Sequence, residues 1–563
     1  MLTDDPSTLT DFHATVEAFL GEYFSRNPGY AAHLGFHEYD GGVTDYSAAA
    51  IEGWLGRVRH YRGQLATFDR AALPAGDQFD LDVLDLALDS ELFRWAELAD
   101  WRRNPMEYLS ALDVSSYLKR NYAPLAIRVQ AAARQLDHVP DTLAQARANL
   151  VLPLPASFVE TSLSMYKGTL GFMEHELPAA VEQLRDDAGG ADHGALLADF
   201  ESRRHMAADA LREFMGYLES LQAGATQDFA IGADRYRRML WTGEAVDLPL
   251  DALLAVGEAD LARNGAAFEA LAKSIDPART PVQLIEELGT KHPGKDDLVP
   301  ETRAMLEELR DWVIAHDLVG VPSDVRIEVA ETPSFMRWAF AMMDAPGAFE
   351  RVAKESFYYV TPPEENWSAG EQEEWLTKFD YATLRDVSIH EAYPGHYVHF
   401  LHYQNVPSRV RRIFGAYSFW EAWAHYSEHV MVEQAFRPAD HDLRLAQLSE
   451  ALLRDVRFVV SIKMHTLGMS VDDATRFFME RAYLPEKPAR QEAVRGTFDP
   501  GYLNYTLGKL MLLKLREDCR ARAAAASEAF SLRQFHDQFL SYGAPPVPFV
   551  RRAMLGGADG SIL

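Results

Sequence analysis

The chain has 563 residues, 48% of them hydrophobic, which is enough for several domains or for one large body with a well-buried core. Its 84 acidic and 55 basic side chains give a net charge of −29, and such a surface repels nucleic acid and anionic membranes, so neither is expected as a partner. The single cysteine and the lack of a signal-type start or a long apolar run predict a cytoplasmic protein without a membrane span.

The first 320 residues have the periodicity of helices. Apolar side chains recur at intervals of three and four in residues 9–26, 78–98 and 123–139. Proline and glycine punctuate these runs, as they do between helices. The pattern predicts an N-terminal helical lobe over residues 1–320.

Two short segments then break the helical pattern. Residues 323–331 alternate polar and apolar side chains, and residues 356–363 (SFYYVTPP) are rich in β-forming residues and stop at prolines. They predict a small antiparallel sheet whose edge is suited to an extended peptide. Residues 321–563 are therefore expected to contain this sheet, a metal site and further helices, in one continuous two-lobed fold with the N-terminal lobe.

A histidine-rich motif, HEAYPGHYVHF, begins at His390. Its second histidine, His396, comes six residues later, whereas the zinc-protease motif H-E-x-x-H places its histidines four apart on one helical face. Residues six apart on a straight helix point about 120° away from each other. Pro394 lacks an N–H and Gly395 tolerates unusual backbone angles, so the pair predicts a helix break after Glu391 that returns His396 to His390.

A catalytic zinc site needs a third ligand and leaves one position for water. Glu421 follows His396 by 25 residues and shares a helical face with Glu428. The sequence therefore predicts a zinc site with the ligands His390, His396 and Glu421. Glu428 is expected to support the ligands, and Glu391 is expected to be the base that activates water.

Other histidines near this motif, and other HE pairs, fit ordinary positions. His37 and Glu38 form an HE pair that no histidine follows at the spacing of the motif. His399 and His402 fit the surface of a helix. The joint pattern of an HE pair, a nearby histidine and a following helix with a glutamate favours a metal site over chance.

The same residues carry a resemblance to a known family. HEAYPGHYVHF followed by FWEAWAHYSEH resembles the motifs H-E-A-Y-P-G-H-H and E-G-W-A-x-Y-x-E of the bacterial DUF885 family. LGFHEYDGG, RFVVSIKMHTLGMS and DPGYLNYTLGKL resemble its other blocks, so the resemblance spans nearly the whole chain. This family is similar in fold to M32 carboxypeptidases and, more loosely, to M3-type metallopeptidases. The resemblance implies a mostly α-helical, two-lobed body with a deep cleft and a zinc ion at its floor.

The resemblance also implies roles for individual residues. The matching positions are His390 and His396 for the two histidines, Glu391 for the HE glutamate, Glu421 for the E-G-W glutamate, and Tyr505 and His465 for a tyrosine and a histidine of the later blocks. The chain departs from the family's pattern at Tyr397, Ala422, His425 and Ser461, none of which is an expected ligand.

A peptidase also needs groups that hold its substrate. The candidate donors to the oxyanion are Tyr505, Tyr502 and His465. Arg495 is the first candidate for binding a C-terminal carboxylate, and Arg454 and Arg457 come next.

Together these features predict a zinc metallohydrolase, most simply a peptidase or carboxypeptidase that cleaves short peptides with a metal-activated water. Three alternatives stay open: hydrolysis of another amide or ester at the same site, a non-catalytic peptide-binding protein of the same fold, and a di-iron carboxylate protein. The last expects Glu-x-x-His pairs on two helices, whereas the helix of Glu421 offers Glu-x-x-x-His.

Overall fold

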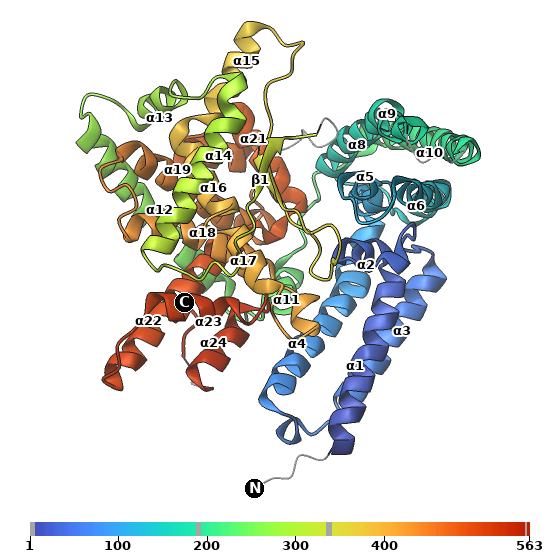
Figure 1. The fold of residues 1–563 in the computed structure, drawn as a ribbon, viewed down its shortest axis with the longest axis horizontal. Coiled ribbons are helices and arrows are strands. Elements are labelled where there is room, and N and C mark those ends of the chain that lie inside the picture. The colour runs from blue at the N-terminus through green and yellow to red at the C-terminus, as the bar shows by residue number, and fades with distance from the viewer. Residues whose placement is uncertain (1–5, 187–192, 334–340, 558–559) are drawn as a thin grey trace. The chain divides into compact units, whose positions relative to one another are not determined.

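The computed structural model describes residues 6–186, 193–333, 341–557 and 560–563. Helices dominate these residues, and three short strands among them form one sheet (Figure 1). The predicted mostly helical class with a small sheet is confirmed. No helix in the described ranges combines the length and the apolar character needed to cross a bilayer.

The chain divides into two compact units. Unit 1 comprises Met1–Phe229 and Pro346–Lys354, and unit 2 comprises Ala230–Ala345 and Glu355–Leu563. The boundary near residue 229 differs from the boundary at 320 that the sequence suggested. The helices between these positions belong to unit 2 because they pack on its C-terminal helices; an added Cβ on Gly257, for example, would lie 2.2 Å from the ring of Phe458.

Among its described residues, unit 1 consists mainly of helices. Its α-helices are α1 (Pro6–Arg26), α2 (Pro28–Leu34), α3 (Ala48–Leu65), α4 (Ala75–Leu92), α5 (Ser116–Lys119), α6 (Leu125–Asp137), α7 (Val139–Asn149), α8 (Ala156–Gly171), α9 (Leu177–Glu182) and α10 (Gly194–Leu221). Phe12, Val16 and Phe19 of α1 are buried at the intervals that the sequence predicted. Phe19 stacks on Trp54 of α3, with ring centroids 6.4 Å apart, so the apolar stripes of α1 and α3 face each other.

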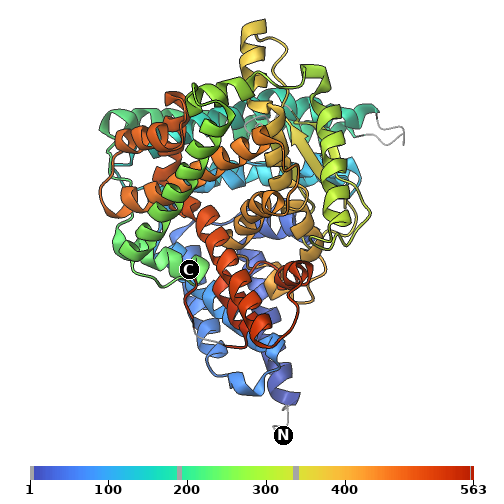
Figure 2. The same cartoon turned by 90° about the vertical axis from the view of Figure 1, so that its left-hand side faces the viewer.

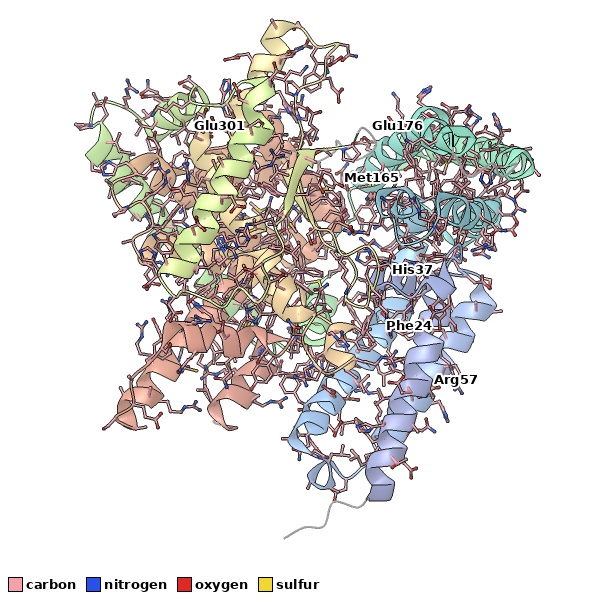
Figure 3. All side chains as sticks on the ribbon, viewed as in Figure 1. Phe24, His37, Arg57, Met165, Glu176 and Glu301 are labelled. Carbon is pink, nitrogen blue, oxygen red and sulfur yellow. The ribbon has the colours of Figure 1, made fainter. Side chains whose placement is uncertain are left out.

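The segment Pro346–Lys354 completes unit 1 although it is distant in sequence. The ring of Phe349 packs against that of Phe36, with centroids 4.8 Å apart. Glu350 is buried, and its Oε2 lies 2.8 Å from Nε2 of His37, which is labelled in Figure 3. The histidine of the N-terminal HE pair therefore has a structural role: it holds this segment.

Unit 2 contains the remaining helices and the sheet. Its α-helices are α11 (Ala233–Glu244), α12 (Leu250–Ile275), α13 (Pro281–Gly289), α14 (Leu298–Ala315), α15 (Ala369–Leu376), α16 (Tyr381–Glu391), α17 (His396–Tyr403), α18 (Tyr417–Glu433), α19 (His441–Thr466), α20 (Val471–Arg481), α21 (Glu486–Phe498), α22 (Asn504–Ala525), α23 (Leu532–Leu540) and α24 (Val547–Leu555). The orange and red helices in Figure 2, which include α18, α19 and α22, form its core.

The sheet of unit 2 is mixed, not antiparallel as predicted. Its strands β1 (Glu328–Glu331), β2 (Ala341–Asp344) and β3 (Phe357–Val360) lie in the order β1-β3-β2. β3 pairs in parallel with β1 and antiparallel with β2. The sequence pattern missed β2 because its residues, AMMD, include no β-branched or aromatic side chain. β2 pairs with one side of β3 and β1 pairs with the other side. β3 is therefore the central strand rather than an edge.

Candidate metal centre

The predicted helix break lies where the sequence placed it. α16 ends at Glu391 and α17 begins at His396. The buried indole of Trp423, on α18, donates its N–H to the carbonyl of Pro394 at 2.8 Å and so fixes the turn between the two helices. The prediction of an interruption is confirmed, and Trp423 supplies an anchor that the sequence reading did not identify.

Gly395 is needed in this turn for its small size. An added Cβ at this position would lie 1.7 Å from the carbonyl oxygen of His390. Any larger residue would therefore push α16 away from the start of α17, which carries His396.

The break brings His390 and His396 together. Their ring centroids are 4.8 Å apart, with the ring planes at 89°. Oε2 of Glu421 lies 3.3 Å from Nε2 of His390 and 3.6 Å from Nε2 of His396. Burial opposes ionisation, yet the two imidazoles hold the pKa of Glu421 well below its usual value. Two imidazole nitrogens and a carboxylate oxygen thus converge from three helices.

Glu391 lies beside the same histidines. One ligand atom each of His390, Glu391 and His396 lie within 4.8 Å of one another. Oε2 of Glu391 accepts a hydrogen bond of 3.3 Å from the backbone N–H of Met343 in β2. The edge of the sheet therefore orients this carboxylate. Both Glu391 and Glu421 are close enough to act with the histidine pair, one as ligand and the other as base.

Glu428 holds His390 from its other ring nitrogen. Its Oε1 lies 2.6 Å from Nδ1 of His390, and its Oε2 lies 2.9 Å from Nδ1 of His425. Arg454 lies 3.2 Å from Oε1, and Glu428 is fully buried. A carboxylate on Nδ1 fixes the tautomer in which Nε2 carries the free electron pair, as in carboxylate–histidine–zinc sites. Nε2 is the nitrogen that faces Glu421.

These contacts fit a metal ion such as zinc. Oε2 of Glu421 is buried and makes no hydrogen bond within the described residues, although two imidazole nitrogens face it. A carboxylate oxygen without a hydrogen bond beside two imidazole nitrogens is the donor set of a two-histidine, one-carboxylate zinc site. The residues present therefore suit the ion that the sequence predicted.

Tyr505 borders this cluster, together with a tyrosine that the sequence reading missed. The ring of Tyr505 stacks on that of His390, with centroids 6.4 Å apart and planes at 23°. Tyr417 meets Tyr505 edge-on at 5.6 Å. Burial is the main cause of the raised pKa of Tyr417, and the nearby Tyr505 is the second. The hydroxyl of Tyr417 therefore stays protonated at neutral pH. The signal was available: Tyr417 precedes Glu421 by four residues and shares its helical face.

Two arginines lie near these tyrosines, and they differ in their exposure to solvent. Arg495 donates to the hydroxyl of Tyr417 at 3.3 Å and pairs with Asp499. Its side chain is 33% exposed, so it retains access to solvent. Arg457 is buried and forms two hydrogen bonds with Glu492, of 2.7 and 2.8 Å. Of the two, Arg495 is the better placed to meet a ligand.

His465 and Tyr502 lie in the core instead of the cluster. Nε2 of His465 lies 2.7 Å from the carbonyl of Gly496, and Nδ1 accepts from the backbone N–H of Ile231. Tyr502 is fully buried, and its hydroxyl lies where a side chain on Gly496 would be. His465 follows Arg454 by 11 residues on α19, about 16 Å along the helix axis. That distance keeps His465, which the family resemblance assigned to the site, away from His390.

The two remaining histidines of the motif bind backbone carbonyls. Nε2 of His399 lies 3.0 Å from the carbonyl of Gly543, and Nε2 of His402 lies 2.8 Å from that of Gly320. Their rings anchor α17 to the core of unit 2. Neither is directed to the cluster, as expected, but His399 is fully buried, so its predicted place on the helix surface is wrong.

Comparisons with known proteins support this fold. The family model described as "Bacterial protein of unknown function (DUF885)" matches residues 28–554. A solved structure described as "a putative lipoprotein of unknown function from Shewanella oneidensis" is 25% identical, with a TM-score of 0.80 over 97% of this chain and 99% of that one. "The putative lipoprotein from Colwellia psychrerythraea" is 16% identical, with a TM-score of 0.82 over 99% of both chains. No curated protein matches the chain.

Proposed function

This chain belongs to the DUF885 family, and from the cluster of His390, His396 and Glu421 we propose that it is a zinc-dependent hydrolase that cleaves short peptides. The observation that carries the proposal is the contact of Glu428 with Nδ1 of His390. This contact leaves Nε2 of His390 directed at Glu421. A bound zinc ion would supply Lewis-acid polarisation of a carbonyl and a water of lowered pKa. The predicted kinship with M32 carboxypeptidases forms part of this proposal and rests on the motifs.

The chain's own residues supply the remaining functions. Glu391, held by the N–H of Met343, accepts the proton of the attacking water. The hydroxyl of Tyr505 or Tyr417 donates a hydrogen bond to the oxyanion. Arg495, partly exposed beside Tyr417, binds the C-terminal carboxylate of the substrate, which gives the carboxypeptidase form of the proposal.

The edge of β2 is suited to the substrate's backbone. β2 is an edge strand of the sheet, and the N–H of its Met343 faces Glu391. A peptide that paired with this edge in extended form would run past Glu391 and the histidines. The sequence assigned that role to residues 356–363, but these form the central strand, so we assign it to Ala341–Asp344.

The proposal is tested by metal analysis of the purified protein, followed by digestion of a peptide library with and without chelator. We expect about one zinc per chain and cleavage that chelation abolishes and added zinc restores. Zinc binding without cleavage of any peptide, with hydrolysis of other amides or esters, would replace peptides by another substrate. Zinc binding without any hydrolysis would favour a peptide-binding protein of the same fold. A protein that binds no zinc would refute the proposal.

The cytoplasmic location predicted from the sequence stays a prediction. The two similar structures are described as lipoproteins, so cell fractionation with an antibody against this chain is the direct measurement.

A further inference from the structure

The helix that carries Glu421 begins without a cap of its own. The residue before α18 is Ala416, whose side chain has no acceptor for the free N–H groups of the first turn. The acceptor comes from a helix 174 residues earlier in the chain: Oε2 of Glu244, the last residue of α11, accepts from the backbone N–H of Ser418 at 3.1 Å. A carboxylate at this position also complements the positive end of the helix dipole.

The other oxygen of the same carboxylate reaches a second helix. Oε1 of Glu244 accepts a hydrogen bond of 2.9 Å from the side-chain amide of Asn504, the first residue of α22. The next residue is Tyr505, which stacks on His390. One buried side chain, 3% exposed for Glu244, thus joins the start of the Glu421 helix to the start of the Tyr505 helix.

The two helices are in backbone contact beside this junction. An added Cβ on Gly508 of α22 would lie 2.3 Å from the carbonyl oxygen of Ser418 and 2.6 Å from Cβ of Ala422. Such close packing fixes the distance between α18 and α22. It does not stop one helix from sliding along the other, so other contacts must do so. Hydrogen bonds from one carboxylate to both helices prevent that sliding.

We propose that Glu244 is a positioning residue, whose buried carboxylate sets Glu421 and Tyr505 against each other across the metal site. The inference rests on the proposed function, because it assigns Glu421 to the metal and Tyr505 to the substrate. It accounts for Asn504 and Gly508 in the block YLNYTLGKL, which the metal site alone does not explain.

The test uses three variants and three measurements. Glu244→Leu removes both hydrogen bonds at similar size. Glu244→Gln retains both, because its amide oxygen accepts from Ser418 and the amide of Asn504 can turn to offer its oxygen. Asn504→Ala cuts only the link to α22. The measurements are the zinc dissociation constant by chelator competition, kcat and KM on a cleaved peptide, and hydrogen exchange of the amides of residues 417–421 in metal-free protein.

We expect Glu244→Leu to weaken zinc binding about 10- to 100-fold, as loss of a group that orients a ligand does, and to speed exchange at residues 417–421. Glu244→Gln is expected to bind zinc as the unaltered protein does, because both hydrogen bonds are retained. Asn504→Ala is expected to lower kcat with little change in KM or zinc affinity. Asp440→Ala is the control, because Asp440 caps α19 through Leu443, so it costs stability without touching zinc affinity.

Unchanged zinc affinity in Glu244→Leu would overturn the inference, as would equal losses in Glu244→Leu and Asp440→Ala. If Glu244→Leu does not fold, kcat of Asn504→Ala decides, and an unchanged kcat would overturn the inference. If the unaltered protein binds zinc but cleaves nothing, the proposed function fails while zinc affinity still tests the positioning role. If it binds no zinc, exchange at residues 417–421 decides, and equal rates in Glu244→Leu would overturn the inference.

Discussion

Replacing Glu428 by glutamine removes a buried negative charge that three side chains contact. The carboxylate meets His390, His425 and Arg454, and none of these contacts is open to solvent. Glutamine offers one oxygen, and its NH₂ group must face a partner that also donates. Loss of such a group typically weakens metal binding 10- to 100-fold, which equals about 1.4–2.8 kcal/mol.

The metal-free protein is also expected to lose stability. Breaking a buried ion pair by removing one partner typically costs about 3–5 kcal/mol. Arg454 keeps a second partner, Glu450, at 2.8 Å, so we expect the lower end, about 3 kcal/mol. Chelator competition measures the zinc affinity of the Glu428→Gln variant, and urea denaturation of the metal-free protein measures its stability.

Glu433→Gln is the matched control for this experiment. Glu433 lies on the same helix and pairs with the buried Arg516 at 2.6 Å, but it makes no recorded contact with His390. It is expected to lower stability and leave zinc affinity unchanged. Zinc affinity that is unaltered in Glu428→Gln, or that falls equally in both variants, would refute the reasoning.

Further predictions separate the roles within the cluster. Glu391→Gln is expected to keep the metal and to lose about 10²–10⁴-fold in rate, as removal of a general base does, whereas Glu421→Ala is expected to lose most of the zinc; zinc contents in the reverse order would exchange the two roles. His396→Ala is expected to abolish zinc binding and His402→Ala to leave it intact; zinc retained by the first variant would remove His396 from the ligands. Burial raises the pKa of Glu244 to about 7, so the folded state binds the proton of this carboxyl group more tightly than the unfolded state. The stability that this proton contributes is therefore lost as pH rises from about 4.5 to 7. Relative to Glu244→Gln, the free energy of unfolding of the unaltered protein is expected to fall by about 3 kcal/mol across that range; urea titrations with parallel pH profiles would contradict this.

The parts of the site that the sequence predicted are those set by local chemistry. Pro394 cannot continue the helix that carries His390, so the break and the approach of His396 to His390 follow from the motif itself. Glu421 could be predicted because it occupies the next helix, on the face it shares with Glu428. The need for a residue without a side chain at position 395 escaped the sequence reading, because the carbonyl that Gly395 approaches becomes apparent only once both helices are built.

The parts that escaped prediction depend on long-range packing. Glu244 lies far from α18 in the sequence, and nothing around it indicates a cap. β2 has weak β-propensity and pairs because β3 is already buried beside it. His465 was expected at the site from the family's motifs, and a motif match does not give the distance of a residue from His390 along α19.

The segment Pro346–Lys354 has a consequence for the order in which the chain folds. The ribosome releases Met1–Phe229 well before this segment, because all of Ala230–Ala345 must be translated first. Until then Phe36 lacks the ring of Phe349 and His37 lacks the carboxylate of Glu350. A fragment that ends at Phe229 would therefore leave apolar side chains such as Phe36 without the cover that Phe349 provides. Unit 1 is first in the chain but can finish its core only after β2 has been synthesised.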